Sequence, residues 1–261
     1  METTNWLRQT ADKPLFPDVL WSRPENKRHA GKLLIVGGHA QSFSAVSAAF
    51  IAASKAGAGT VRILLPDSLQ KTLGRTLAEA EFAASTPIGS FSQKALGHLL
   101  DLSDWSDAVL LAGDLGKNSE TAILLEKFID KYSGLLCLAG DSIDYFINRA
   151  GSILDRSDTL VIAEIGQLQK LAQPRAAIRQ QADLAQLVNT LSIFTDGIAA
   201  EIITFHERQI VVAKGKVSTT KFNKEINREE LAAYAVTWLI QQPAVPFESI
   251  TTAVYDYCKN F

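Results

Sequence analysis

The sequence predicts an α/β protein in which a mostly parallel sheet is covered by helices on both faces. Two observations indicate this fold class. Short apolar runs alternate along the chain with segments of helical periodicity, which is the order of elements that a parallel sheet requires. The runs lack polar alternation, as is typical of strands buried on both faces. At 261 residues with 47% hydrophobic content, the chain is long enough to form one large core.

The first unit of the sheet is predicted to be a strand, a glycine turn, a helix and a second strand. Residues 33–36 form the first apolar run, and Gly37-Gly38 permits a tight turn that a ligand can approach closely. The small residues over 44–55 predict a helix that lies close to the sheet, and residues 60–65 predict the next strand. The N–H groups at the helix start, near residues 42–45, predict a place where an anionic group can sit.

The remaining elements continue this alternation. Strands are predicted over residues 107–112, 135–139 and 159–163, and a hairpin over residues 198–205 and 209–213. Helices are predicted after Asn118 or Ser119 as N-cap, then over residues 141–146, 173–191, 229–241 and 247–257. Pro174 is well placed at the first position of the helix over 173–191.

The N-terminal residues differ from the rest of the chain. Residues 1–29 carry three prolines and two tryptophans without a clear period. They predict an ordered arm, followed by a single domain over residues 30–261. We expect the aromatic side chains of the arm to pack on the domain or on a neighbouring subunit, so that the protein is a homo-oligomer.

Composition limits the classes of partner. The 26 basic and 28 acidic residues nearly cancel, which argues against nucleic acid as an obligate partner. Cys137 and Cys258 lie far apart and predict free thiols in a reducing compartment. No stretch has the apolar length of a signal peptide or a membrane span. We expect a cytoplasmic protein without a membrane partner, and no metal site is predicted, since no histidine has a metal-spaced partner.

A family resemblance rests on several of these residues. The order of Gly31, Gly37-Gly38, Ser44-Ala45, residues 56–61 and residues 112–116 is similar to that of the ADP/ATP-dependent NAD(P)H-hydrate dehydratases, members of the ribokinase-like superfamily. The resemblance covers residues 27–66 and 105–145, and after residue 158 it is only topological. It implies a ribokinase-like three-layer fold, ATP or ADP as cofactor and a small-molecule ligand of nucleotide or nicotinamide type.

The resemblance also implies a ligand pocket. In the family, a G-G-S turn and a G-A pair line the substrate pocket. Gly37 and Gly38 stand at this turn, with His39 in place of Ser, and Ser44 and Ala45 stand at the pair. We therefore expect a bound small molecule to lie beside these residues.

Other family motifs are only partly present. The phosphate loop G-P-G-L-G falls at residues 112–116, where Gly116 is kept and Asp114 replaces a glycine. Asp141 keeps the second acid of a D-A-D strand end, and an ordinary N-cap is its alternative interpretation. The nucleotide-holding L-K-G segment falls at residues 204–206, which ends in His206 and has neither Lys nor Gly. A solvated turn is the alternative interpretation of that histidine.

The late G-T-G-D motif, which supplies the anion hole and the base in the family, is absent. The best register places residues 226–229 there. Asn227 and Arg228 carry a Cβ and do not easily adopt the positive φ angles of the glycines. Glu229 is a weak candidate for the base, and its alternative interpretation is an acidic residue in the first turn of an exposed helix.

Three functions remain open from the sequence. The first is an active ADP/ATP-dependent dehydratase or small-molecule kinase with Glu229 or Asp141 as base. The second is a degenerate, weakly active or non-catalytic protein that still binds a nucleotide or nicotinamide-type ligand. The third is a structural subunit without a ligand. The sequence favours the second, because the residues for nucleotide grip and proton abstraction are absent together.

Overall fold

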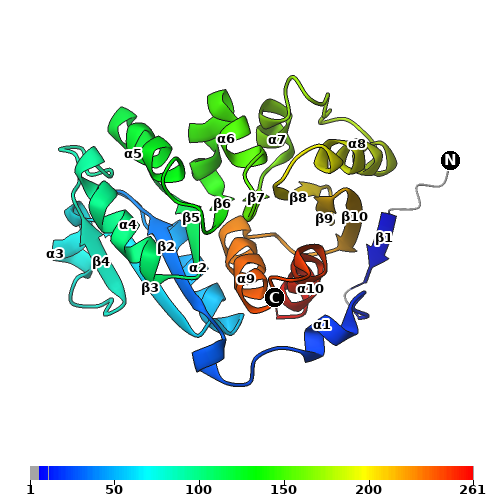
Figure 1. Ribbon diagram of the computed structural model, residues 1–261, viewed down its shortest axis with the longest axis horizontal. Helices are drawn as coiled ribbons and strands as arrows, with labels where there is room; N and C mark the ends of the chain where they lie inside the picture. The colour runs from blue at the N-terminus through cyan, green and yellow to red at the C-terminus, as the bar shows by residue number, and fades with distance from the viewer. Residues whose placement is uncertain (1–5, 11, 261) are drawn as a thin grey trace.

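A single sheet runs through the molecule (Figure 1). The computed structural model describes residues 6–10 and 12–260, and within them the sheet has 10 strands in the order β1-β10-β9-β8-β7-β6-β5-β2-β3-β4. The strands are β1 Trp6–Gln9, β2 Lys32–Gly37, β3 Thr60–Pro66, β4 Ala80–Ala83, β5 Ala108–Gly113, β6 Leu135–Ala139, β7 Thr159–Ile162, β8 Glu201–His206, β9 Gln209–Lys214 and β10 Lys216–Lys221.

The pairing of these strands is mostly parallel. From β4 through β8 every neighbouring pair is parallel, while β9 pairs antiparallel with both β8 and β10. The predicted hairpin is confirmed, with His206 opposite Gln209. The predicted α/β three-layer fold is therefore also confirmed.

Helices cover both faces of the sheet. One face is covered by α2 Ser44–Lys55, α9 Arg228–Gln241 and α10 Pro246–Asn260. The other is covered by α4 Leu96–Trp105, α5 Ser119–Ile129, η4 Gly140–Arg149, α6 Gly151–Leu154, α7 Ile165–Leu171 and α8 Leu184–Asp196 (Figure 1). The short elements α1 Pro17–Trp21, η1 Lys27–His29, η2 Asp67–Leu69, α3 Gln70–Leu73 and η3 Gln93–Ala95 complete the chain.

The apolar run of β2 shows why the sheet needs two covering layers. Leu33 and Ile35 lie in the core on one face, whereas Leu34 and Val36 lie in the core on the other. All four side chains are buried. A strand with one solvent-facing side would expose two of them, so the unbroken apolar pattern fits only a central strand.

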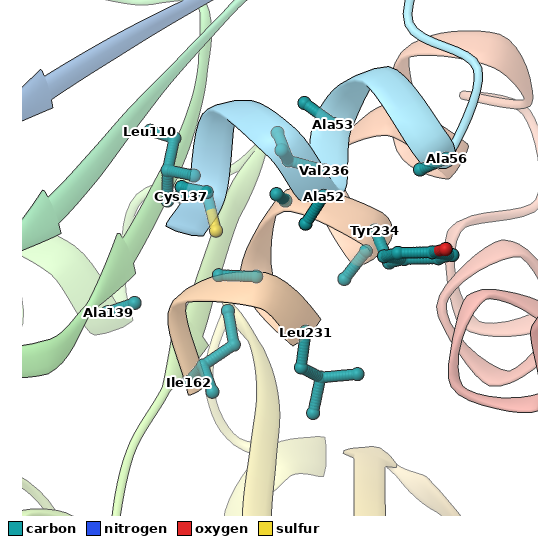
Figure 2. Packing of buried hydrophobic residues seen from close by; sticks show 14 of the residues in the cluster. Ala52, Ala53, Ala56, Leu110, Cys137, Ala139, Ile162, Leu231, Tyr234 and Val236 are labelled. Atoms are coloured by element: carbon teal, nitrogen blue, oxygen red, sulfur yellow. The ribbon is translucent and has the colours of Figure 1, made fainter. Parts of the chain in front are cut away.

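Small residues bring α2 close to α9. Figure 2 shows Ala52, Ala53 and Ala56 of α2 beside α9, with Cys137 of β6 in the same core. Because an alanine side chain occupies little space, the two helix backbones can approach each other over the sheet. This packing brings the first turn of α9 to the edge of the sheet where β5 and β6 end.

One predicted helix is wrong. Residues 173–191 do not form a continuous helix, because α7 ends at Leu171 and α8 begins only at Leu184. Asp183 is the N-cap of α8, and its carboxylate accepts a hydrogen bond from the Gln186 N–H at 2.8 Å. This local cap fixes the helix start well after Pro174.

The segment predicted as an arm contributes the edge strand β1, which pairs parallel with β10. The indole Nε1–H of Trp6 donates a hydrogen bond to Thr219 Oγ1 at 3.0 Å. Trp21, in contrast, is 84% exposed. Within residues 6–10 and 12–260, no helix combines the length and the apolar character needed to cross a membrane.

Candidate functional site

The predicted site residues gather along one edge of the sheet. Because β2, β5, β6, β7 and β8 are parallel, their carboxyl ends lie at the same edge. The helices α2, α7 and α9 begin there as well. In open α/β sheets this edge is where ligands bind.

The glycine turn after β2 holds two loops together. Gly38 has a φ of 86°, and its N–H donates a hydrogen bond to the Gly113 carbonyl at 3.0 Å. A Cβ on Gly37 would lie 2.4 Å from that same carbonyl oxygen. Any larger residue at Gly37 would therefore separate the turn from the loop that follows β5.

The predicted anion-binding end of α2 is occupied by a side chain of the protein itself. Oδ2 of Asp114 accepts hydrogen bonds from the Ser42 hydroxyl at 2.7 Å, the Ser44 hydroxyl at 3.1 Å and the Ala45 N–H at 2.9 Å. Phe43, the N-cap residue of α2, makes no side-chain cap bond. Asp114 therefore caps this helix from a distant loop and meets the positive end of its dipole.

Burial and hydrogen bonding act in opposite directions on this carboxylate. Burial alone would raise the pKa of Asp114. The hydrogen bonds from the Ala45 N–H and the two serine hydroxyls, together with the attraction of His39, outweigh burial and lower this pKa below its ordinary value. At neutral pH the end of α2 is thus paired with a negative charge.

Asp141 faces the same loop from the end of β6. Its Oδ1 lies 3.4 Å from the Leu115 N–H, and a Cβ on Gly113 would lie 3.2 Å from that oxygen. Burial raises the pKa of Asp141, and the Asp114 carboxylate raises it further, while the Leu115 N–H opposes the shift. The carboxylate turns toward the loop and does not cap η4, whose N-cap residue is Ala139.

The first turn of α9 supplies the third carboxylate. A Cβ on Gly140 would lie only 3.0 Å from Oε1 of Glu229, and Gly140 has a φ of 61°. Glu229 therefore lies over the end of β6. The neighbouring side-chain oxygen of Asn227 accepts the N–H groups of Glu229 and Glu230, each at 3.1 Å. Two of the free donors of this helix start are thus already paired.

A pocket of about 750 Å³ opens beside α9. His206 and Phe205 line it from the end of β8, and Arg228 lines it from α9. Its other lining residues are Glu164, Ile165, Gly166, Gln180, Gln181, Ala182, Glu207, Lys224, Glu225 and Ile226. The pocket therefore combines an aromatic ring with two cationic side chains, Lys224 and Arg228, and three carboxylates.

A second, smaller pocket of about 330 Å³ lies between the loop after β5 and η4. Gly116 and Asp141 line it, together with Lys117, Asn118, Ser119, Asp144 and Tyr145. The site residues predicted from the sequence thus fall into separate groups. Gly116 and Asp141 share this pocket, His206 lines the larger one, and the Gly37-Gly38 turn with Ser44-Ala45 surrounds Asp114.

No group of three or more His, Cys, Asp or Glu side chains suited to a metal ion occurs among the residues that the structure describes. The carboxylates of Asp114, Asp141 and Glu229 are each directed to a different glycine or helix end. The arrangement offers hydrogen-bond acceptors and negative charge at the strand ends, with two cationic and three acidic side chains in the larger pocket.

Sequence reasoning missed the part played by Asp114 and Ser42. The replacement of a family glycine by Asp114 was visible, but its hydrogen-bond partners lie about 70 positions earlier in the chain. A further signal was the pair of serines at the start of a helix whose N-cap position is Phe43. A helix without its own cap implies that another group supplies the acceptor.

The fold and the position of this edge are similar to those of ribokinase-like proteins of known structure. A ribokinase-like superfamily protein from Enterococcus faecalis has a TM-score of 0.73 at 17% identity, and the alignment covers 98% of this chain and 87% of that one. An ADP/ATP-dependent NAD(P)H-hydrate dehydratase from Bacillus subtilis, co-crystallised with ATP and Mg²⁺, has a TM-score of 0.65 at 14% identity, with 93% and 86% covered.

A sequence relative supports the same resemblance. The chain is 26% identical over 165 residues to a bifunctional NAD(P)H-hydrate repair enzyme of Salinibacter ruber. The match covers 61% of this chain and 30% of that relative. No family model matches the chain. The resemblance to the NAD(P)H-hydrate dehydratases is thereby confirmed, at low identity.

Proposed function

We propose that this chain binds a nucleotide or nicotinamide-type ligand at the carboxyl edge of its sheet and is weakly active or inactive as a dehydratase. The observation that carries this proposal is the cap of α9. The family resemblance assigns this position to backbone N–H groups that hold a phosphoryl group. Here the N–H groups of Glu229 and Glu230 donate to the side chain of Asn227. Loss of one such donor costs an enzyme about 10²–10³ in rate.

The larger pocket supports ligand binding. Its volume of about 750 Å³ lies within the range of roughly 300–1,000 Å³ that small-molecule sites occupy. Phe205 offers a ring against which a base can pack, and Lys224 offers a charge for phosphate. ATP or ADP is therefore the cofactor class that we expect to bind here.

Calorimetric titration with ADP, ATP, NADH and NADPH tests the binding role. We expect saturable binding of at least one of them and a large loss of affinity in His206→Ala. His98→Ala is the matched control, because His98 pairs with Glu81 beside β4 and lines neither pocket. Absence of all binding would instead support the structural-subunit alternative.

A second candidate function is catalysis with Glu229 as base. The position of its carboxylate over Gly140, at the end of β6, favours this alternative. A base must lie within about 2.6–3.2 Å of the atom that carries the proton it removes. Turnover of NAD(P)H hydrate with ADP or ATP that depends on Glu229 would establish it.

We also propose that the protein is a cytoplasmic homo-oligomer. The exposed Trp21 supports assembly, since large aromatic side chains are enriched at interfaces. The two cysteines are unpaired and buried, as expected in a reducing compartment. The near balance of charges still argues against nucleic acid as a partner.

A further inference from the structure

We propose that Asp114 is a built-in anion that occupies the start of α2 and excludes a ligand's phosphate from this part of the sheet edge. The inference rests on the proposed ligand-binding function of the same edge. One oxygen of Asp114 receives the hydroxyls of Ser42 and Ser44 and the N–H of Ala45. These donors are the groups that would otherwise hold an anionic group at this helix start.

An incoming phosphate would meet two obstacles. It would first have to displace the Asp114 carboxylate from its three hydrogen bonds. It would then lie close to the Asp141 carboxylate, which faces the same loop through the Leu115 N–H. Among the residues that the structure describes, the charge attraction that favours the Asp114 carboxylate comes from His39. Like charge and occupied donors therefore both act against an anion here.

The exclusion determines which part of a ligand binds in the larger pocket and which part binds beside the start of α2. Lys224 and Arg228 line the larger pocket together with three carboxylates, and Arg228 is paired with Glu164. The start of α2 beside the Gly37-Gly38 turn is occupied by the Asp114 carboxylate. A phosphate that binds at this edge is therefore left with the larger pocket, where Lys224 is its cationic partner. The group that enters beside the turn is uncharged or a hydrogen-bond donor. Asp114 is thus a specificity-determining residue for this edge.

The backbone of the loop makes this inference testable without disturbing the fold. Asp114 has a φ of 55°, and its neighbours Gly113 and Gly116 have φ angles of 115° and 68°. Glycine adopts such angles at no steric cost, while Asp tolerates them better than most residues. Asp114→Gly therefore fits the existing loop conformation and removes only the carboxylate.

Pyrophosphate is the probe that tests the exclusion, with the Ala45 amide resonance as the local readout. In the unaltered protein we expect pyrophosphate to leave this resonance unchanged. In Asp114→Gly we expect a shift of the Ala45 resonance and a gain in pyrophosphate affinity of about tenfold, as charge-assisted bonds to the freed donors imply. Asp144→Asn is the matched control, because it removes a nearby negative charge that makes no contact with α2.

Two results would overturn the inference. One is saturation of the Ala45 shift by pyrophosphate at equal concentrations in the unaltered protein and in Asp114→Gly. The other is a similar gain in affinity in Asp144→Asn, which would indicate a general charge effect. If Asp114→Gly does not fold, Asp114→Asn is the second test. We expect pyrophosphate to shift the Ala45 resonance of this variant as well, with a gain in affinity smaller than that expected for Asp114→Gly. Titration with ADP, followed at the His206 resonance, tests the proposed ligand-binding function separately. The exclusion by Asp114 can therefore fail while the proposed function holds, and the reverse is also true.

Discussion

Arg228 directs its guanidinium to Glu164, with Nη1 2.8 Å from Oε1. The pair joins the first turn of α9 to the start of α7 across the larger pocket, which both residues line. An arginine with a free charge at this position would attract a phosphate in place of the missing glycine motif. The charge of Arg228 is instead held by a carboxylate at the pocket wall. The ion pair therefore limits how much Arg228 contributes to binding a nucleotide.

Glu164→Gln should release this charge to a ligand. We expect ADP to bind roughly two- to fivefold more tightly, because exposed pairs of this kind are worth up to about 1 kcal/mol. The free energy of unfolding should change by less than about 1 kcal/mol, since the Glu164 side chain is 60% exposed. Titration calorimetry measures the affinity. Asp155→Asn, which breaks the distant Arg175–Asp155 pair, is the control, and an equal gain there would contradict the argument.

The Asp114 cap should give the protein a stability that depends on pH. The folded-state pKa of Asp114 is lowered, so its stabilising effect is complete above the unfolded value of about 3.9 and is lost as pH falls through the lower folded value. We expect Asp114→Asn to lower the free energy of unfolding by roughly 0.5–2 kcal/mol at pH 7. Urea unfolding from neutral pH to below pH ~4 should show this difference shrinking. A difference independent of pH would mean that the charge is not involved.

The sequence predicted those parts of the fold that depend on local pattern. The helix over 44–55 and the strand over 135–139 agree with α2 and β6 to the residue, because their periodicity and flanking glycines are local. The edge strands β1 and β4, and the strand β10 beside β1, were not predicted. β1 is completed by its parallel pairing with β10, more than 200 positions away in sequence, as Trp6 and Val217 illustrate.

The site was predictable only in part for the same reason. The glycine turn at Gly37-Gly38 follows from local pattern, and it lies where expected. The capping of α2 by Asp114 requires β2 and β5 to be neighbouring strands. Their adjacency is a property of the strand order in the sheet and not of the local sequence. The pairing of Arg228 with Glu164 likewise depends on how α9 crosses the sheet toward α7. No spacing in the sequence encodes either contact.

A bulky residue at Ala45 tests whether a ligand lies beside the turn. Ala45 is half-buried in the first turn of α2, and its N–H takes part in the Asp114 cap. We expect Ala45→Phe to abolish binding of the nucleotide or nicotinamide ligand while the protein stays folded, because the ring would occupy the position beside the turn where the ligand is expected. Circular dichroism and calorimetry measure the two properties. Ser54→Phe, exposed near the other end of α2, should bind normally; unaltered affinity in Ala45→Phe would place the ligand elsewhere.

The oligomer should depend on the N-terminal segment. Trp21 in α1 is 84% exposed, although so large an apolar side chain is usually mostly buried. We expect light scattering at tens of micromolar to give a multiple of the chain mass, and Trp21→Ser to lower it. Ile193→Ser serves as the control, because Ile193 is 69% exposed on α8. A monomer mass for the unaltered protein would contradict the proposal.

Activity is the prediction that separates the two candidate functions. We expect turnover of NAD(P)H hydrate with ADP or ATP to lie orders of magnitude below the usual enzymatic range of about 1–10³ per second. The physical reason is that Asn227 already holds the N–H groups of Glu229 and Glu230. A phosphoryl group would find few free donors at the start of α9.

A coupled absorbance assay of the Glu229→Gln variant completes this test. Glu230→Gln, from the same turn of α9, is the matched control. If the protein is a binder, both variants should match the unaltered protein in its low rate and should keep their affinity for ADP. Glu229 lies over Gly140 at the strand ends, so it is the candidate base of these two glutamates. Turnover in the enzymatic range that is lost in Glu229→Gln and retained in Glu230→Gln would establish catalysis, and the cap of α9 would then have to open during the reaction.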